Sequence, residues 1–207
     1  MSTRILLADD HFLFCEGLKS LLSQQPDFEV VATASDGREA VLECARVNPD
    51  VVIMDITMRG LNGIEATVRI RAERPQLPVI ILSMHDTAEH VHRALDAGAN
   101  GYLVKDSAAQ ELVDAVRAVR LGRRYLGGTL AAQVALSTPS RSPVDRLTPR
   151  EREVLQLVME GRSSAEVART MALSPKTVDT YRSRLMEKLG VHDVASLARI
   201  AIKLGLV

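Results

Sequence analysis

The first part of the chain alternates between two hydrophobic patterns, one typical of buried strands and one typical of helices. Apolar runs bounded by polar residues occupy 5–8, 28–34, 51–55, 79–82 and 101–104, as in strands of a parallel sheet that is covered on both faces. After each run, apolar residues recur at helical spacing. This alternation predicts right-handed strand–helix–strand units and therefore an α/β, flavodoxin-like, doubly wound sheet of five parallel strands.

The last part of the chain carries only the helical pattern. Residues 137–143 are rich in Ser, Thr, Pro and Arg and lack apolar periodicity, which indicates a linker. Helix starts are predicted at Thr148 and at Ser174, because each is a hydroxyl residue directly before a proline. We therefore expect three regions, which are a domain at 3–122, a linker at 123–145 and a small all-α domain at 146–207.

Polar side chains end four of the predicted strands. Asp9 and Asp10 follow the first strand, Asp55 ends the third, Ser83 follows the fourth and Lys105 follows the fifth. Because the carboxyl ends of parallel strands share one edge, these groups are expected to meet in one crevice. Any one of them alone is more often a solvated surface residue, but their joint placement predicts a site.

The chemistry of the predicted crevice follows from its crowded acids. Carboxylates this close stay ionised beside a divalent cation, and a set of oxygen ligands suits Mg²⁺, with Asp10 and Asp55 as direct ligands and Asp9 through water. Asp55 is then placed to attack phosphorus as a nucleophile. Lys105 and the Ser83 hydroxyl are placed to share the charge of an aspartyl phosphate.

Composition narrows the class of protein. The chain has 207 residues, 46% of them hydrophobic, and a formal net charge of zero, so it is globular and has no global field toward nucleic acid or membrane. The charge is unevenly distributed along the chain. Residues 1–144 contain 15 Lys and Arg and 18 Asp and Glu, so they are acidic, whereas residues 145–207 contain 11 Lys and Arg and 8 Asp and Glu, so they are basic.

Other sequence features argue against secretion and membrane insertion. Cys15 and Cys44 lie inside apolar helical patterns without metal-ligand spacing, and we interpret them as small buried hydrophobes instead of a disulfide. The apolar run near the N-terminus is too short for a signal peptide. No stretch approaches the roughly 20 apolar residues of a membrane span. We expect a cytoplasmic protein with no membrane contact.

The N-terminal motifs resemble the receiver domain of bacterial two-component response regulators, over roughly residues 3 to 122. The resemblance rests on Asp-Asp after the first strand, Met-Asp-Ile-Thr-Met around Asp55, Leu-Ser-Met at Ser83 and Gly-Tyr-Leu-Val-Lys-Asp at Lys105. It implies that Asp55 accepts a phosphoryl group from a sensor histidine kinase or a small phosphodonor. It also implies roles for further residues: Mg²⁺ ligands at Asp9, Asp10, Asp55 and the main-chain carbonyl of Thr57, a phosphate partner at Lys105, and a switch pair at Ser83 and Tyr102.

Two residues near this predicted site are unusual. Arg59 stands four residues after Asp55, where members of the family usually have Pro. This change alters the stiffness of the loop and adds a positive charge, so it bears on reaction rates. Met84, beside Ser83, is bulky and is expected to narrow access to the pocket.

Residues 164–183 predict a helix-turn-helix whose second helix offers polar side chains on one face and Val178, Leu185 and Leu189 on the other. From the residues alone, an ordinary amphipathic helix is an equal alternative. The motifs Leu-Thr-Pro-Arg-Glu-Arg-Glu-Val-Leu, Leu-Ser-Pro-Lys-Thr-Val and Lys-Leu-Gly-Val resemble the LuxR-type output domain of the NarL/FixJ class of regulators, over about 146 to 207.

This second resemblance implies a DNA contact surface on the recognition helix. Candidates for phosphate contacts are Lys176, Thr177, Tyr181, Arg182, Arg184 and Lys188, and candidates for base contacts are Asp179, Thr180 and Ser183. The last helix, 194–204, has a wide apolar face, and in the family this helix pairs two output domains. The alternative is that this face belongs only to the domain core.

We therefore expect a transcription factor that dimerises and binds DNA when Asp55 is phosphorylated. Two alternatives remain. The first is a DNA-binding regulator that works without phosphorylation. The second is an enzyme, a phosphatase of the haloacid-dehalogenase kind, although its nucleophile sits on the first strand within Asp-x-Asp, whereas Asp9 and Asp10 are adjacent. Apart from self-phosphorylation and dephosphorylation at Asp55, no enzymatic activity is expected.

Overall fold

The computed structural model describes residues 2–128, 130–136, 143–191 and 193–203. The chain forms two compact units, Met1–Pro139 and Ser140–Val207. Most of the Ser- and Pro-rich part of the expected linker, 137–142, lies outside the described residues, as does Leu204 at the end of the expected last helix.

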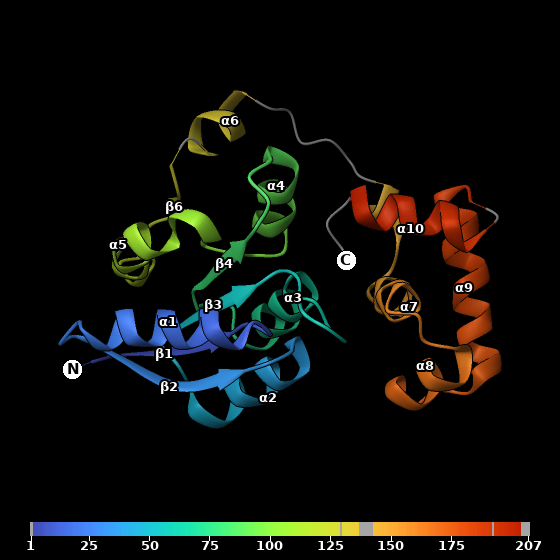
Figure 1. Cartoon of the computed structure of the whole chain (residues 1–207), viewed down its shortest axis with the longest axis horizontal. Coiled ribbons are helices and arrows are strands. Elements are labelled where there is room, and N and C mark those ends of the chain that lie inside the picture. The colour runs from blue at the N-terminus through green and yellow to red at the C-terminus, as the bar shows by residue number, and fades with distance from the viewer. Residues whose placement is uncertain (1, 129, 137–142, 192, 204–207) are drawn as a thin grey trace. The chain divides into compact units, whose positions relative to one another are not determined.

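The first unit is built on a parallel sheet with the strand order β2-β1-β3-β4-β5-β6, which confirms the doubly wound α/β fold (Figure 1). Its strands are β1 (Thr3–Ala8), β2 (Phe28–Ala34), β3 (Val51–Asp55), β4 (Val79–Ser83), β5 (Gly101–Val104) and β6 (Tyr125–Leu126). Its helices are α1 (Phe12–Ser23), α2 (Gly37–Val47), α3 (Gly63–Glu73), α4 (Ala88–Asp96), α5 (Ala108–Arg120, after a 3-10 turn at Lys105–Ser107) and α6 (Leu130–Leu136).

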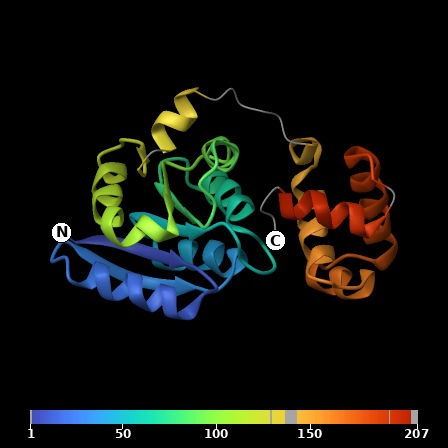
Figure 2. The same cartoon turned by 45° about the horizontal axis from the view of Figure 1, so that its top comes forward.

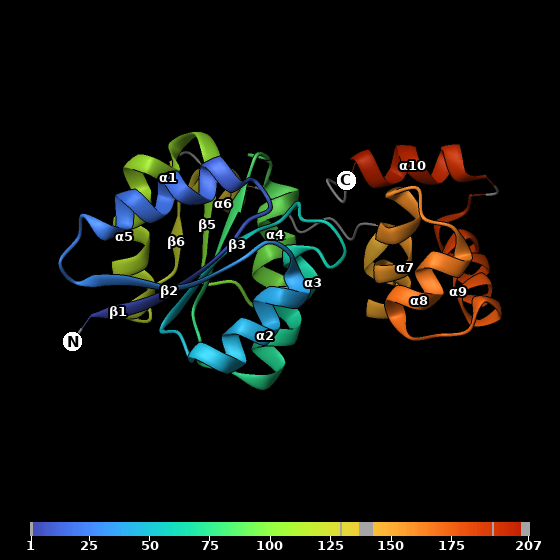
Figure 3. The same cartoon turned by 60° about the horizontal axis from the view of Figure 1, so that its bottom comes forward.

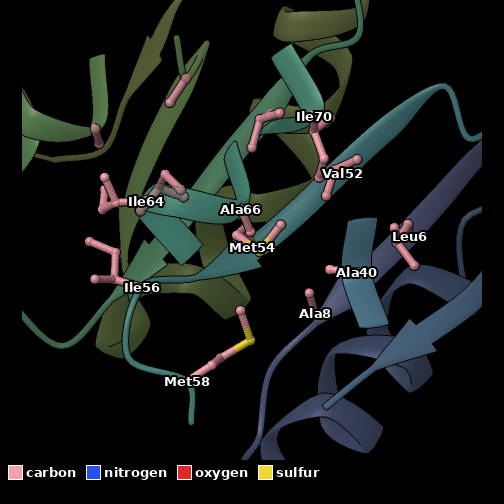
Figure 4. Close-up of a cluster of buried hydrophobic side chains, with 14 of the residues drawn as sticks. Leu6, Ala8, Ala40, Val52, Met54, Ile56, Met58, Ile64, Ala66 and Ile70 are labelled. Carbon is pink, nitrogen blue, oxygen red and sulfur yellow. The ribbon is translucent and has the colours of Figure 1, made fainter. Parts of the chain in front are cut away.

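Helices cover both faces of the sheet, so the central strand is apolar on both sides. In Figure 3, α1 and α5 lie over one face and α2, α3 and α4 over the other. Val51 and Ile53 of β3 pack into the cluster under α1 and α5, whereas Val52 and Met54 pack into the cluster drawn in Figure 4. All four are at most 1% exposed, and burying each stabilises the fold by about 1.5–3 kcal/mol. This double burial explains the uninterrupted apolar run.

The sheet contains one strand more than the sequence predicted, and it lies inside the expected linker. β6 pairs with β5, and the Tyr125 N–H donates to the Asn100 carbonyl at 3.0 Å. Helix α6 follows, with Leu130 buried and Val134 packed against the core on the α4 side. The five-strand prediction was wrong because a strand of two residues is too short to show a period-two pattern.

The second unit is all helical in its described part, as predicted. It contains a 3-10 turn (Pro143–Arg146) and the helices α7 (Pro149–Met159), α8 (Ser164–Met171), α9 (Pro175–Leu189) and α10 (Val194–Lys203), seen from a second direction in Figure 2. Leu155, Val167, Val178 and Leu185 lie in a single core. No helix in the described part of the chain is long and apolar enough to cross a membrane.

The predicted helix starts of this unit are present. Thr148 forms a reciprocal capping box with Glu151 at the start of α7, and the Ser174 hydroxyl accepts the Thr177 N–H at the start of α9. Between α8 and α9, Ala172 adopts the left-handed backbone conformation with φ of 54°, which ends α8 and makes the tight turn. The second unit thus contains the helix-turn-helix that the sequence predicted.

Candidate functional site

Strand register brings the predicted polar residues to neighbouring positions on one edge of the sheet. Ala8 pairs with Met54, so Asp9 lies next to Asp55 at the tips of β1 and β3. Asp55 pairs with Leu82, so Ser83 lies one residue beyond it on β4. Ser83 pairs with Val104, and Lys105 follows directly at the end of β5. Register therefore brings together the residues that the sequence predicted to meet.

The chain leaves this edge through a tight connection to α3. Asn62 caps that helix by accepting the Glu65 N–H, and the Gly63 N–H donates to the Ile56 carbonyl at 2.9 Å. A side chain at Gly63 would overlap the main-chain carbonyl of Asp55. Only glycine therefore lets α3 approach the tip of β3 so closely, and this contact fixes the main chain at Asp55.

Lys105 lies between two buried carboxylates. Its Nζ atom is 2.8 Å from Oδ2 of Asp9 and 2.9 Å from Oδ2 of Asp55. Lys105, Asp9 and Asp55 are 8%, 6% and 1% exposed, so water screens these charges weakly. The ammonium also lies 4.9 Å from the centre of the Phe14 ring, within cation–π distance. One ammonium thus faces two acids, and negative charge remains in excess.

The pKa of Asp55 reflects this environment. Burial raises it to about 6, the Lys105 ammonium opposes the rise, and repulsion from Asp9 adds to it. A hydrogen bond from the Thr57 main-chain N–H also favours the ionised form. The carboxylate is thus more basic than an ordinary aspartate yet ionised at neutral pH, as a nucleophile requires.

A histidine that the sequence analysis did not select joins the acids. Nδ1 of His11 is 3.2 Å from Oδ1 of Asp9, 3.1 Å from Oδ1 of Asp10 and 3.9 Å from Oδ2 of Asp55. Its position directly after Asp9 and Asp10 in the sequence could have indicated that it lies at the site. In the described residues, Asp9, Asp10, His11 and Asp55 form the one group of three or more acidic, His or Cys side chains that could hold a metal ion.

The donor set fits a divalent cation. Oδ1 of Asp10 is buried and accepts no hydrogen bond from the described residues, and the carboxylates repel one another unless a cation lies among them. Three of the four predicted Mg²⁺ ligands, Asp9, Asp10 and Asp55, are brought together. The fourth, Thr57, is exposed in the loop directly after β3.

The predicted switch residues share one partner. The Ser83 hydroxyl accepts the His85 N–H at 3.0 Å, and the Tyr102 hydroxyl donates to the His85 carbonyl at 2.8 Å. Tyr102 is fully buried, and burial raises its pKa to about 12. The His85 ring stacks on His90 with ring centres 4.3 Å apart. The loop between β4 and α4 therefore connects both switch residues.

The two unusual residues line hollows beside the acids. Arg59 is exposed and borders an open hollow of about 480 Å³ together with Asp10 and His11. Met84 is 65% exposed and borders another, of about 310 Å³, together with Phe14 and Lys105. Both side chains therefore border the space directly beside the acids and Lys105.

The predicted DNA contacts all lie on α9 but differ in exposure. Tyr181, Arg182 and Thr177 are half-buried, and the exposed group is Lys176, Asp179, Thr180, Ser183, Arg184 and Lys188. The Thr180 hydroxyl donates to the Lys176 carbonyl within the helix at 2.9 Å. Asp179, Arg182 and Lys188 are held by residues of α8 or α7.

Asp179 and Arg182 both bind the first residue of α8. The Ser164 hydroxyl donates to Oδ1 of Asp179 at 2.7 Å and accepts from Nη1 of Arg182 at 3.0 Å. Ser164 thus ties the two helices of the helix-turn-helix together. In this arrangement Asp179 is already engaged, which reduces its freedom to contact a base.

Lys188 is also engaged. Its Nζ atom lies 2.7 Å from Oε2 of Glu151, which is 2% exposed and belongs to the capping box of α7. Burial alone would raise the pKa of Glu151, but the hydrogen bonds from Lys188 and Thr148 hold it below its usual value. The sequence did not predict this ion pair.

Two protein families match the chain. The response regulator receiver domain matches residues 5–117, and the bacterial regulatory proteins of the luxR family match residues 145–201. The response regulator UvrY of Escherichia coli (strain K12) is 37% identical over 206 residues, which cover 98% of this chain and 94% of UvrY.

Solved structures agree with these matches. A LuxR-family two-component response regulator from Aurantimonas sp. SI85-9A1 is 38% identical, with a TM-score of 0.63 over 65% of this chain and 96% of that one. RcsB from Salmonella enterica serovar Typhimurium, bound to promoter P1flhDC in the presence of the phosphomimetic BeF3-, is 26% identical, with a TM-score of 0.61 over 97% of this chain and 98% of RcsB.

Proposed function

The chain belongs to the response regulators that join a receiver domain to a LuxR-type DNA-binding domain, and from this membership we propose that phosphorylation of Asp55 controls its binding to DNA. The observation that carries the proposal is the buried Lys105 ammonium within 2.9 Å of both Asp9 and Asp55, beside further acids that suit a cation. A buried nucleophile beside fixed positive charge is what phosphoryl transfer requires.

The proposed reaction starts with a carboxylate oxygen of Asp55. This oxygen forms a bond to phosphorus while the bond between phosphorus and the leaving group breaks. The leaving group, a histidine nitrogen of a sensor kinase or an acyl oxygen of a small phosphodonor, keeps the bonding electrons. The Lys105 ammonium pairs with the phosphoryl oxygens, and the Ser83 hydroxyl donates to them.

Mg²⁺ is the proposed cofactor, and when bound it neutralises charge on the phosphoryl oxygens. Asp9, Asp10, Asp55 and the Thr57 carbonyl would hold it, because carboxylate and carbonyl oxygens are the ligands that Mg²⁺ prefers. The proposed activity is limited to self-phosphorylation and dephosphorylation at Asp55.

The switch is proposed to run through the loop between β4 and α4. Ser83 accepts from the main chain of His85 and Tyr102 donates to it. If the Ser83 hydroxyl turns to the phosphoryl group, it gives up the His85 N–H. The loop and Tyr102 then change together, which shifts the population of conformations of the first unit.

DNA is the proposed target of α9, with the residue roles expected from the sequence except at Lys188, whose ammonium is paired with Glu151. The RcsB complex with promoter P1flhDC supports this for a relative of the same family. Homodimers are proposed to form on activation through α10, where Val194 is 46% exposed although Leu197 and Ala201 are committed to the core. A cytoplasmic location and a sensor kinase partner are further proposals, which membership of the family supports.

A DNA-binding titration tests the proposed function. Full-length protein is titrated against a pool of genomic fragments at one salt concentration, with and without Mg²⁺ plus a small acyl phosphate, and wild type is compared with Asp55→Asn. We expect tighter binding on phosphorylation in the wild type only. Equal binding in all conditions would indicate a regulator that works without phosphorylation, and absent binding would contradict the DNA function.

A further inference from the structure

A serine outside the recognition helix joins two of the candidate DNA contacts. Ser164 is the first residue of α8, and its hydroxyl donates to Oδ1 of Asp179 at 2.7 Å and accepts from Nη1 of Arg182 at 3.0 Å. A carboxylate only accepts and a guanidinium only donates, so the direction of both bonds is fixed. Hydrogen bonds to charged groups are also stronger than those between neutral groups. Ser164 therefore holds both side chains in one arrangement.

The packing beneath this contact determines where Ser164 lies relative to α9. Val167 of α8 and Val178 of α9 are fully buried in the core of the second unit. The Ser163 hydroxyl caps the start of α8, and Ala172 makes the tight turn that joins the two helices. The Ser164 hydroxyl is thus carried by a helix whose position the core fixes.

The bond to Ser164 leaves Asp179 able to accept from a second donor. Ser164 binds Oδ1, whereas a carboxylate has two oxygens and about four acceptor sites in all. The Asp179 side chain is exposed on α9, so it can accept from the amino group of a cytosine. A side chain whose rotation is already restricted loses less conformational entropy when it binds a partner. The bond to Ser164 therefore favours a base contact in one direction.

The same contact offsets the negative charge of Asp179. DNA phosphates repel a carboxylate, so an acid on α9 weakens binding to all sequences unless its charge is offset. Arg182 shares the Ser164 hydroxyl with Asp179, which brings a positive charge close to the acid. Ser164 also begins α8, and the partial positive charge at the start of a helix favours a nearby anion. The contact therefore lowers the electrostatic cost of placing Asp179 next to DNA.

We propose that Ser164 is a positioning residue for DNA recognition, which orients Asp179 toward a cytosine and so determines part of the sequence preference. The inference rests on the proposed contact of α9 with DNA. It gives a role in specificity to a residue of α8, outside the helix that contacts the bases. A purely structural role would affect all DNA sequences equally, whereas a positioning role affects the preference at one base position.

Selection from duplexes of randomised sequence tests the proposal. Full-length protein, treated with Mg²⁺ and a small acyl phosphate, is incubated with the duplexes at one salt concentration, and the bound duplexes are sequenced. Wild type should prefer cytosine at one position of its site, and Asp179→Ala should lose that preference. Ser164→Ala should reduce the preference about fivefold, and the double variant should match Asp179→Ala.

Two control variants separate positioning from a structural effect. Ser164→Thr keeps a hydroxyl and should retain the wild-type preference. Ser163→Ala removes the capping hydroxyl of α8 but not the bond to Asp179, so it should change the affinity for all sequences alike.

Three outcomes would contradict the proposal. A cytosine preference that is unchanged or stronger in Ser164→Ala would overturn the role of Ser164 and leave the DNA function standing. A preference that survives in Asp179→Ala would overturn it as well, because another residue would then read that base. Selection of no sequence by the wild type would overturn both this inference and the proposed DNA function.

Discussion

The two units hold their functional residues in opposite ways. At the edge of the sheet, Asp9, Asp55, Ser83 and Lys105 are all at most 8% exposed and contact one another or the main chain nearby. On α9, the candidate DNA contacts lie mostly in solvent. Phosphoryl chemistry gains from fixed charges in a weakly screened site, whereas DNA recognition needs side chains that can reach a partner.

This difference has a thermodynamic consequence. The crowded, buried carboxylates repel one another in the folded state unless a cation lies among them. Substitutions at the carboxyl ends of the strands should therefore change the free energy of unfolding. Substitutions of exposed residues usually change it by less than about 0.5 kcal/mol, so those on α9 should change DNA affinity alone. Lys188 is an exception, because this exposed residue of α9 is paired with the buried carboxylate of Glu151.

Lys105→Met should have the largest effect on stability. Removing one partner of a buried ion pair leaves uncompensated charge and typically costs about 3–5 kcal/mol. Because Asp55 can take up a proton, we expect a loss at the lower end, about 3 kcal/mol, in metal-free protein near neutral pH. Hydrogen exchange of peptides from β3 and β4 measures the loss in the full chain.

The double variant Lys105→Met with Asp55→Asn is the matched control. It removes one of the two acids that the ammonium contacts, so it should recover more than half of the lost stability. A cost below about 1 kcal/mol for Lys105→Met alone would contradict the view that buried charge dominates this site.

Asp55→Asn should stabilise the metal-free protein, in a pH-dependent way. Burial raises the pKa of Asp55 from its ordinary 3.8 to about 6. Between about pH 4 and pH 6 the folded protein therefore holds a proton that the unfolded chain has lost, and the free energy of unfolding falls as pH rises through that window. Asp55→Asn has no carboxyl group at this position and so avoids this decrease in the free energy of unfolding, which is at most about 3 kcal/mol.

Denaturant unfolding of both proteins in the presence of a chelator checks this expectation. Wild type and Asp55→Asn should be equally stable near pH 4. Above pH 7, Asp55→Asn should be more stable than the wild type. Mg²⁺ should then stabilise the wild type more than the variant, since a bound ion stabilises only the state that holds it. Equal free energies of unfolding for wild type and Asp55→Asn at all pH values would show that folding does not raise the pKa of Asp55.

The sequence was sufficient to predict the sheet edge because each group there follows a strand signal directly. Asp9, Asp55 and Lys105 stand at the ends of apolar runs, and parallel pairing alone brings such ends together. β6 could not be predicted, because Tyr125 and Leu126 join the sheet through main-chain bonds to β5 that leave no periodic pattern in a strand this short.

Contacts between side chains of different helices could not be predicted from the sequence, for a different reason. The pairing of Glu151 with Lys188, and of Ser164 with Asp179 and Arg182, depends on how two helices cross, and helical periodicity does not specify that. His11 directly follows the Asp9–Asp10 motif, but the orientation of its ring toward the acids depends on the turn before α1. The site residues were thus predictable where backbone topology places them.

Arg184→Met should weaken DNA binding about tenfold and reduce the salt dependence of binding by about one counterion, if Arg184 contacts a phosphate. Its stability should change by less than about 0.5 kcal/mol because the side chain is exposed. Arg123→Met removes the same charge from an exposed position of the first unit and should change affinity less than about twofold. Equal losses in both variants would indicate a general charge effect with no specific contact at Arg184.

Lys188→Met should have the smallest effect on DNA binding and a measurable effect on stability, although the family resemblance made Lys188 a candidate for a phosphate contact. Its ammonium is bound to a buried carboxylate at the start of α7, but its own side chain is 37% exposed, so screening limits the expected cost to about 1 kcal/mol. Glu151→Gln in the same chain should recover part of that cost. A tenfold loss of DNA affinity with unchanged stability would instead make Lys188 a phosphate contact, and would show that the pair with Glu151 opens when α9 meets DNA.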